Sequence, residues 1–302
     1  MKNRFPIRCC MILMGLTFVV VFFSLFPRGG VSQPQSDGKE KIKLDVPYEP
    51  SSEEVVKTML EIAKVERNDL VYDLGCGDGR IVIAAAQKAG ARGVGVDLDP
   101  ERVKESLENA RKAKVTDRVE FFQQDLFQTD ISKATVVMLY LWPEVNLKLR
   151  PKLLRELKPG TRIVSHSHGM GDWETDQTIT AAEGHRVHFW VIPANVTGTW
   201  DWEMPGEKNR YVLKLNQKFQ KVSGTLQSGS DGISIKNLEL RGDRLMFTLE
   251  RPIQGQMKTL RFIGYVKGHF MEGTAEDLIP GSQAKQTWKA RRDPSSMEPL
   301  DY

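Results

Sequence analysis

The chain has 302 residues, of which 40% are hydrophobic and 27% charged, so it is long enough for two domains and too apolar to be disordered. Its formal net charge of +4 is small for this length, and no block of like charges stands out, which argues against a nucleic-acid partner. Of the three cysteines, Cys9 and Cys10 lie in an apolar N-terminal run and leave Cys76 alone in the folded part. A framework of intramolecular disulfides is therefore excluded there.

The N-terminus has the pattern of a membrane-directing segment. Basic side chains precede an apolar run from Cys9 to Phe26, which is about as long as the shortest spanning helices and longer than most signal-peptide cores. Because a cleavage site is poorly marked, we expect residues 1–30 to form a membrane anchor, a single N-terminal hydrophobic helix. Export after signal cleavage is the alternative, and the side of the membrane that the chain faces stays open. Residues 31–44 have the composition of an exposed linker.

From residue 45 the hydrophobic pattern alternates between strands and helices, after a capping box, Ser51-x-x-Glu54, that opens an amphipathic helix. The expected strands are Leu70–Leu74, Gly93–Asp97, Val119–Phe122, Thr135–Leu139 and Arg162–Ser167, and the expected helices between them are Ile81–Ala89, Glu101–Lys112 and Glu144–Leu157. This alternation predicts an α/β fold, a Rossmann-like doubly wound domain over residues 45–194 with a parallel sheet covered on both faces. Its ligands would bind beyond the carboxyl ends of the strands.

The first of these strands runs into a glycine loop. Asp73 is followed by Gly75, Gly77 and Gly79 and then by a helix, so the backbone can turn sharply and a ligand can approach it closely. A dinucleotide loop has its third glycine one residue later, and a carboxylate repels its pyrophosphate but attracts an ammonium or sulfonium group. The pattern therefore predicts S-adenosylmethionine, which carries both cations and no phosphate. Asp97, at the end of the next strand, would accept hydrogen bonds from its ribose hydroxyls.

Further short motifs accompany this loop between positions 45 and 176. They are Pro47-Tyr48-x-Pro50-Ser51, the Val-Gly stretch around Asp97, Asp125-Leu126 and Trp173-x-x-Asp176. On these residues and the glycine loop, the region resembles a class I, seven-β-strand S-adenosylmethionine-dependent methyltransferase. More narrowly, it is similar to the lysine methyltransferases of the mitochondrial ATP synthase c-subunit and of the adenine nucleotide translocase, which also begin with an apolar segment. That family typically has Glu where this chain has Asp97.

The resemblance implies a role for each matching residue. Asp73 would orient the methionine end of S-adenosylmethionine, with the backbone of Gly75 to Gly79 against it, and Asp97 would hold the ribose. Asp125 resembles the acid that accepts a hydrogen bond from the adenine amino group, and Leu126 would pack on the adenine ring. Asp125 has an alternative reading as a loop residue that caps the turn after it.

The acceptor side is expected at the end of the fourth strand. Tyr140, Trp142 and Tyr48 would form an aromatic wall that positions an ammonium group by cation–π attraction. The alternative is that Trp142 only caps the sheet. A lysine acceptor has a pKa near ~10.4 and must lose a proton before it attacks the methyl group. His166 and His168 alternate on the fifth strand and are read as a base, a metal-binding pair without a third ligand, or polar residues at a strand end.

After residue 194, short alternating runs separated by turn-forming residues predict antiparallel strands joined by hairpins. The expected strands are Val196–Glu203, Arg210–Leu215, Val222–Leu226, Ile233–Leu240, Arg244–Glu250, Lys258–Val266, Phe270–Glu276 and Gln286–Arg291. They predict an antiparallel all-β domain, a barrel or a sandwich, over residues 195–295, followed by a tail over residues 296–302. Trp200 and Arg291 resemble the early tryptophan and late arginine that pack together in lipocalin-like barrels. The expected role of this domain is binding, docking or stabilisation.

Together these features predict a membrane-anchored S-adenosylmethionine-dependent methyltransferase whose acceptor is a protein lysine. A small-molecule or lipid methyltransferase is an alternative among enzymes, because an aromatic wall suits either acceptor. A noncatalytic exported protein, in which the β-domain does the binding, is the alternative outside enzymes. The intact acids and glycines of the loop favour an enzyme.

Overall fold

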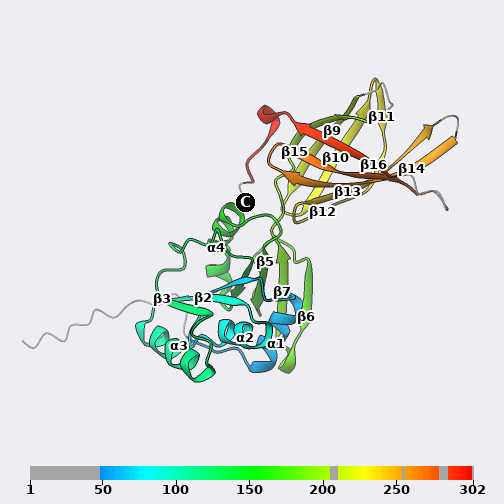
Figure 1. Ribbon diagram of the computed structural model, residues 1–302. Coiled ribbons are helices and arrows are strands. Elements are labelled where there is room, and N and C mark those ends of the chain that lie inside the picture. Colours follow the sequence, from blue (N-terminus) through cyan, green and yellow to red (C-terminus); the bar gives the residue numbers. More distant parts are fainter. Residues whose placement is uncertain (1–47, 205–209, 254–255, 279–284, 301–302) are drawn as a thin grey trace, which may run out of the picture. The chain divides into compact units, whose positions relative to one another are not determined.

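The computed structural model describes residues 48–204, 210–253, 256–278 and 285–300 (Figure 1). The expected membrane segment, residues 1–30, and the expected linker, residues 31–44, lie outside these ranges. Within the described ranges, no helix is both long enough and apolar enough to span a membrane.

A mixed β-sheet forms the first half of the described chain. Its strands are β1 (Leu70–Leu74), β2 (Arg92–Asp97), β3 (Val119–Gln123), β4 (Val136–Leu139), β5 (Arg162–His166), β6 (Gln177–Thr180) and β7 (Arg186–Val191). Their order is β3-β2-β1-β4-β5-β7-β6. Strands β1 to β5 are parallel to one another, whereas β7 is antiparallel to both β5 and β6. The expected parallel sheet is therefore confirmed for β1 to β5 and is wrong for the antiparallel end that β7 and β6 add.

Helices cover both faces of this sheet. They are α1 (Glu53–Ile62), α2 (Arg80–Ala89), α3 (Pro100–Ala113) and α4 (Pro143–Glu156). Figure 1 shows α1, α2 and α3 against one face and α4 on the other. Successive strand side chains point to opposite faces, so in β1 Val71 packs with α1 to α3, whereas Tyr72 and Leu74 pack with α4. β1 is thus buried from both sides, and its carboxyl end is left for a ligand.

The start of α1 differs from the expected capping box by one residue. The N-cap is Ser52, whose hydroxyl accepts a hydrogen bond from the Val55 amide at 3.4 Å. Two adjacent serines are both able to cap a helix, and the hydrophobic pattern does not choose between them. The Ser51 hydroxyl is therefore available for another contact, and its Oγ lies 2.8 Å from Nδ1 of His166.

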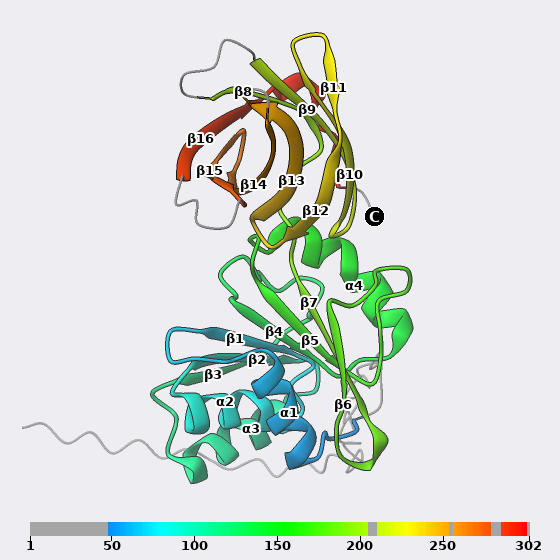
Figure 2. The same cartoon turned by 90° about the vertical axis from the view of Figure 1, so that its right-hand side faces the viewer.

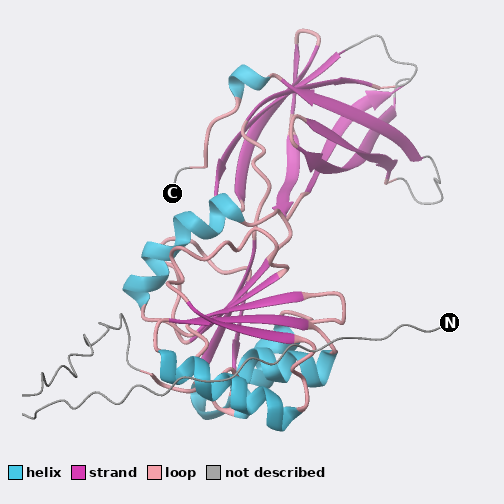
Figure 3. Cartoon of the chain, turned by 60° about the vertical axis from the view of Figure 1, so that its left-hand side comes forward, coloured by secondary structure: helices cyan, strands magenta, loops and turns pink. Residues whose placement is uncertain are grey.

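The second half of the described chain forms an antiparallel sheet. Its strands are β8 (Gly198–Glu203), β9 (Arg210–Lys218), β10 (Lys221–Ser228), β11 (Asp231–Ile233), β12 (Ile235–Arg241), β13 (Arg244–Ile253), β14 (Gln256–Lys267), β15 (Phe270–Asp277) and β16 (Lys285–Arg292). Their order is β11-β10-β9-β8-β16-β15-β14-β13-β12. Figures 2 and 3 show these strands curving into a nearly closed barrel. The expected antiparallel sheet is confirmed, and the expected single strand Ile233–Leu240 is divided between β11 and β12.

Aromatic rings pack together inside this curved sheet. The Trp202 ring lies 5.1 Å from that of Tyr211 and 5.2 Å from that of Trp288, between ring centroids. The Phe247 and Phe262 rings are stacked, with their centroids 4.9 Å apart. All five side chains are buried in one hydrophobic cluster. The curved sheet therefore has a core of its own, separate from the two cores of the mixed sheet.

The arginine that packs on Trp200 is Arg292, so the prediction of Arg291 is wrong by one residue. The Arg292 guanidinium carbon lies 4.7 Å from the centroid of the Trp200 ring, and its side chain is buried. Arg291 is exposed. Because the side chains of a strand alternate between faces, Trp288, Ala290 and Arg292 share the inner face of β16.

The Trp173-x-x-Asp176 motif lies in the segment before β6 and contacts the turn between β9 and β10. The Trp173 indole donates a hydrogen bond of 2.9 Å to the Gln220 side chain, and its ring stacks on Phe219 with centroids 5.6 Å apart. Asp176 accepts a hydrogen bond of 2.7 Å from the Val191 amide at the end of β7. The motif therefore fastens this segment to β7 and to the β9–β10 turn.

Candidate active site

A cleft opens at the carboxyl ends of β1, β2 and β4. The empty space between its lining atoms is about 890 Å³, open solvent included. The segment before α1, the glycine loop, the end of β2, the loop after β3 and the residues after β4 line it. The sheet thus brings together five segments that are distant in the sequence, as expected for a ligand site at the carboxyl ends of parallel strands.

The glycine loop closes on the end of β2. The amides of Gly75 and Cys76 both donate hydrogen bonds of 2.9 Å to the Val96 carbonyl. Gly75, Gly77 and Gly79 have φ values of 87°, 53° and 80°. This left-handed backbone is costly for residues with a Cβ atom, so the sharp turn depends on glycine.

Asp73 is a buried carboxyl that lacks a partner at one oxygen. Its side chain is 1% exposed, and its Oδ2 makes no hydrogen bond with the described part of the chain. Burial, together with the nearby carboxylates of Asp97 and Asp78, raises the pKa of Asp73 to about 8. Ionising such a group in the free protein is costly, and a cation placed beside it would offset that cost.

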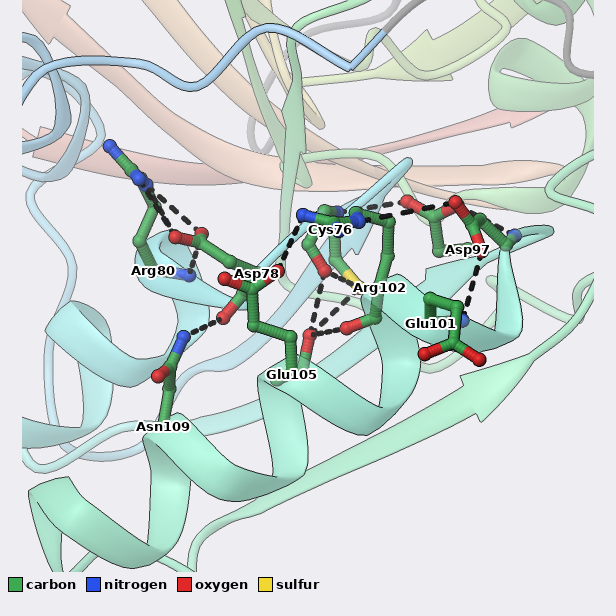
Figure 4. A network of polar contacts seen from close by, with 11 residues as sticks. Cys76, Asp78, Arg80, Asp97, Glu101, Arg102, Glu105 and Asn109 are labelled. Atoms are coloured by element: carbon green, nitrogen blue, oxygen red, sulfur yellow. Dashed lines mark hydrogen bonds and ion pairs between the residues drawn. The ribbon is translucent and has the colours of Figure 1, made fainter.

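Asp97 is held at the end of β2 by the backbone. One carboxylate oxygen accepts a hydrogen bond of 2.9 Å from the Gly77 amide, and the other accepts one of 3.0 Å from the Asp99 amide (Figure 4). Each carboxylate oxygen has a second acceptor position. Asp97 is therefore fixed in orientation and can still accept hydrogen bonds from a ligand.

The segment before α1 folds over the glycine loop. The Tyr48 ring lies so close to Gly77 that a Cβ atom there would be 2.4 Å from the Tyr48 Cε2 atom. The Arg102 guanidinium, from α3, lies 4.7 Å from the centroid of the same ring. Tyr48 therefore covers the middle glycine of the loop.

An ion pair at the start of α2 fixes this segment. Arg80 donates hydrogen bonds to the Asp78 carboxylate from Nε, at 3.0 and 3.2 Å, and from Nη2, at 2.7 Å (Figure 4). It also donates one of 2.7 Å to the Ser51 carbonyl. Burial alone would raise the pKa of Asp78, but the hydrogen bonds and charge of Arg80 outweigh it and hold this pKa below its ordinary value. Asp78 is therefore an anion, and Ser51 is held in place through its backbone.

Tyr140 follows β4 and lies against a buried histidine. Its ring centroid is 3.9 Å from that of His166, at an angle of 30°. Burial and the Glu49 carboxylate raise the pKa of Tyr140. Burial, then the charges of His185 and His168, lowers the pKa of His166 to about 4. At neutral pH the site therefore holds a protonated phenol beside a neutral imidazole.

Most of the predicted site residues meet in this cleft. Its lining includes Tyr48, Asp73, Gly75, Gly77, Asp97, Leu126 and Tyr140. Gly79 lies outside the lining, and a Cβ atom there would be 2.7 Å from the Phe121 ring, which indicates a packing role. Trp142 also lies outside it, half exposed at the N-cap of α4. The binding and catalytic roles of all these residues stay predictions.

Asp125 is turned toward its own loop. One carboxylate oxygen accepts a hydrogen bond of 2.8 Å from the Phe127 amide, and the other accepts one of 3.3 Å from the Gln128 side chain. This is the geometry of the turn-capping alternative. Its neighbours Gln124 and Leu126 line the cleft instead.

Sequence reasoning assigned no role to four residues of the cleft, namely Asp78, Arg80, Arg102 and Gln124, and it read Ser51 only as a helix cap. Asp78 and Arg80 lie inside the glycine motif, so their opposite charges two residues apart were a usable signal. Arg102 and Gln124 carry no local signal, because the fold alone brings α3 and the loop after β3 to the cleft.

The residues of the cleft fit S-adenosylmethionine. Asp73 presents an unpaired buried carboxyl oxygen to a cation, and Asp97 retains acceptor positions for hydroxyl groups. The lining near the loop holds Asp97 and the Asp78–Arg80 ion pair, and a cation beside Asp73 would favour the ionised form of a carboxyl whose pKa is otherwise raised to about 8. The site therefore fits a cationic cosubstrate.

This chain is similar to a methyltransferase family model and to known methyltransferases. Residues 73–177 match the family model described as the ANTKMT methyltransferase domain. A protein-lysine N-methyltransferase of Saccharolobus islandicus is 48% identical over 151 residues, which are 49% of this chain and 94% of the relative. The adenine nucleotide translocase lysine N-methyltransferase of Mus musculus is 32% identical over 133 residues, 44% of this chain and 58% of the relative. A solved RNA methyltransferase of Salinibacter ruber, in complex with S-adenosyl-L-homocysteine, is 52% identical with a TM-score of 0.47, covering 52% of this chain and 97% of that chain.

The strand order, the glycine loop and the two strand-end carboxylates define an S-adenosylmethionine-dependent methyltransferase. The identity with the archaeal protein extends over nearly the whole length of that relative. The chain belongs to the protein-lysine methyltransferase family of which that protein is a member. The resemblance drawn from the sequence motifs is thereby confirmed, as are the enzyme class and the cosubstrate.

Replacing Tyr140 by alanine is expected to slow methyl transfer and to spare cosubstrate binding. The Tyr140 ring lines the cleft and packs on His166, whereas Asp73 and Asp97 stand on other strands. We expect turnover to fall on the order of tenfold and cosubstrate affinity to change by less than about threefold. Single-turnover rates and calorimetric titration measure the two quantities. Tyr265→Ala, at an exposed position of β14, is the matched control, and unchanged turnover in Tyr140→Ala would remove Tyr140 from the acceptor side.

Proposed function

We propose that this enzyme transfers methyl groups from S-adenosylmethionine to the ε-amino groups of lysines in a protein. The observation that carries the proposal is the 48% identity with an archaeal protein named protein-lysine N-methyltransferase, over 94% of that protein's length. The chemistry of the cleft supports it, because acidic and aromatic groups line the part that an acceptor would enter.

The cleft suits a cationic side chain. The Tyr140 ring offers an aromatic surface to an ammonium group, and Glu49 adds an acidic side chain to the same lining, whereas the Tyr48 ring already carries the Arg102 guanidinium. A lysine side chain has a long apolar stem with a compact charge at its end, so it can reach the Tyr140 ring. The Tyr140 hydroxyl keeps its proton at neutral pH, since its pKa is raised, and it can position the nitrogen but not deprotonate it.

The residues of the chain contribute mainly orientation and exclusion of water. S-adenosylmethionine supplies a methyl group on a sulfonium, whose sulfur leaves as a neutral thioether. Transfer is a displacement in line with the carbon–sulfur bond, so holding the amine in that line accounts for much of the rate. The amine must first lose the proton that it carries at neutral pH.

The proposal is tested by transfer of a radiolabelled methyl group from S-adenosylmethionine into lysate fractions. We expect the label to resist ribonuclease, to be released by protease, and to appear on methylated lysines in peptide mass spectra. Soluble and membrane fractions are labelled separately, so the experiment also reports where the acceptor lies. Asp73→Asn is the inactive control. A label that only ribonuclease or lipid extraction removes would assign a nucleic-acid or lipid acceptor instead.

A further inference from the structure

A chain of direct contacts leads from the cleft to the edge of the mixed sheet. Ser51 lines the cleft, and its Oγ lies 2.8 Å from Nδ1 of His166. Nε2 of His166 lies 3.1 Å from Nδ1 of His185. The His185 side chain is 36% exposed, and its Nε2 lies 3.9 Å from a carboxylate oxygen of Glu183. A buried serine of the cleft is thus connected to a solvent-exposed imidazole through one buried imidazole.

The fold holds Ser51 and His166 in place. Ser52 caps α1, so the Ser51 hydroxyl is free for His166, and the Ser51 carbonyl is fixed by Arg80 at 2.7 Å. His166 ends β5, with its ring under that of Tyr140 at 3.9 Å. A buried imidazole that has hydrogen bonds but no acidic partner stabilises a core little more than an apolar residue would. The arrangement therefore calls for a chemical use.

We propose that Ser51, His166 and His185 form a relay that carries the proton of the acceptor ammonium group out of the cleft. This proposal rests on the proposed function, because a lysine acceptor has such a proton to lose. Ser51 touches the acceptor, while His166 and His185 are positioning residues that act through it.

The number of protons on the relay is the same before and after each transfer. A nitrogen–hydrogen bond of the ammonium group breaks, and its proton binds Ser51 Oγ while the hydroxyl proton of Ser51 passes to Nδ1 of His166. The proton on Nε2 of His166 passes to Nδ1 of His185, and the proton on Nε2 of His185 leaves to water beside Glu183. One proton enters, one leaves, and every member is neutral again. After the products leave, the reverse transfers, from water at His185 to water in the open cleft, restore the starting tautomers before the next turnover.

The protonation states in the cleft suit this use. Tyr140 keeps its proton because its pKa is raised, so it is unsuited to be the base. Burial and the neighbouring His185 and His168 keep the pKa of His166 near 4, so its imidazole is neutral at physiological pH and has one nitrogen to accept and one to donate. A relay needs a member in this state rather than a permanent cation.

Chemical rescue at the exposed end tests the relay. We expect His185→Ala to lower kcat on the order of tenfold at unchanged KM, and added imidazole to restore it, because the vacated position is open to solvent. We expect His166→Gln to lower kcat further, on the order of 10²-fold, without rescue, since that site is buried. His269→Gln, a histidine of the antiparallel sheet, is the matched control. Full kcat in His185→Ala, or a loss that imidazole does not restore, would overturn the relay.

A measurement without turnover separates this proposal from the proposed function. Nitrogen-15 spectra of the protein with bound S-adenosylhomocysteine report which nitrogen of His166 carries its proton. We expect Nε2, with Nδ1 accepting from Ser51, and we expect Ser51→Ala to shift the Nδ1 resonance. A proton on Nδ1, or on both nitrogens, refutes the relay even if lysine is methylated. Lysates without methyl-lysine refute the proposed function, whatever the tautomer.

Discussion

Replacing Asp73 by asparagine is expected to abolish cosubstrate binding and to stabilise the free protein at alkaline pH. The carboxylate stands near the end of β1, where it is buried with an unpaired oxygen. Removing one partner of a buried charge pair costs several kcal/mol, so we expect affinity for S-adenosylmethionine to fall on the order of 10²-fold or more. Calorimetric titration measures this loss.

The gain in stability follows from the raised pKa of Asp73. This pKa is about 8 in the folded protein and 3.8 in the reference state. Below about pH 4 the carboxyl is protonated in both states, and the free energy of unfolding carries no penalty. Between these values only the unfolded chain releases the proton, so stability falls as pH rises and reaches its lowest level above about pH 8. Asparagine never ionises, so its advantage is absent near pH 4 and grows to the order of a few kcal/mol at pH 8.

Denaturant unfolding of the cosubstrate-free protein at pH 5 and pH 8 checks this result. Asp117→Asn is the matched control, because that carboxylate is 76% exposed and we expect its replacement to change neither affinity nor the pH dependence of stability. An Asp73→Asn variant that is less stable than the wild type at pH 8 would contradict the assignment of Asp73 as a buried acid with a raised pKa. Retained binding would contradict its role toward the cation.

Replacing Arg292 by alanine is expected to destabilise the antiparallel sheet by about 3–5 kcal/mol. The buried guanidinium donates hydrogen bonds to the carbonyls of Asn195 at 2.8 Å, Thr197 at 3.2 Å and Gly268 at 2.7 Å. It thereby joins the entry to β8, the end of β16 and the turn between β14 and β15. Alanine would leave these carbonyls without that donor and would leave a void against Trp200.

Equilibrium unfolding, followed by near-ultraviolet circular dichroism of the buried tryptophans, measures this loss. Arg291→Ala is a stringent control, since it removes the same side chain from the adjacent, exposed position of the same strand. We expect it to change the free energy of unfolding by less than about 0.5 kcal/mol. Equal losses in the two variants would show that the charge of β16, and not the inward placement of Arg292, stabilises the sheet.

Sequence patterns predicted the structure correctly where a local pattern determines it. β1 has the predicted bounds, Leu70–Leu74, because an apolar run that ends in a glycine loop marks both ends of a buried strand. The glycine loop and Asp97 could be placed beside each other because carboxyl ends of parallel strands share one edge. The family could be inferred because each of its motifs is a short, uninterrupted stretch of sequence.

The features that could not be predicted depend on tertiary packing. β6 is largely exposed, and β7 is buried at four successive positions. Neither strand therefore has an alternating pattern that marks it in the sequence. Arg291 and Arg292 are adjacent arginines, and the register of β16 in the curved sheet decides which one turns inward. Gln124 and Arg102 reach the cleft only because the fold carries them there. The N-terminal anchor stays a prediction.

Ser51 and Ser52 are adjacent, and their hydroxyl groups have two independent roles. Loss of the Ser52 hydroxyl removes a helix cap, a change of about 1 kcal/mol in folding free energy, and leaves the histidines untouched. Loss of the Ser51 hydroxyl leaves the helix capped and breaks the link to His166. A substitution at Ser52 can therefore lower the stability of the fold, whereas a substitution at Ser51, one position earlier, can lower the rate of the enzyme. An inserted residue between them would disturb both at once.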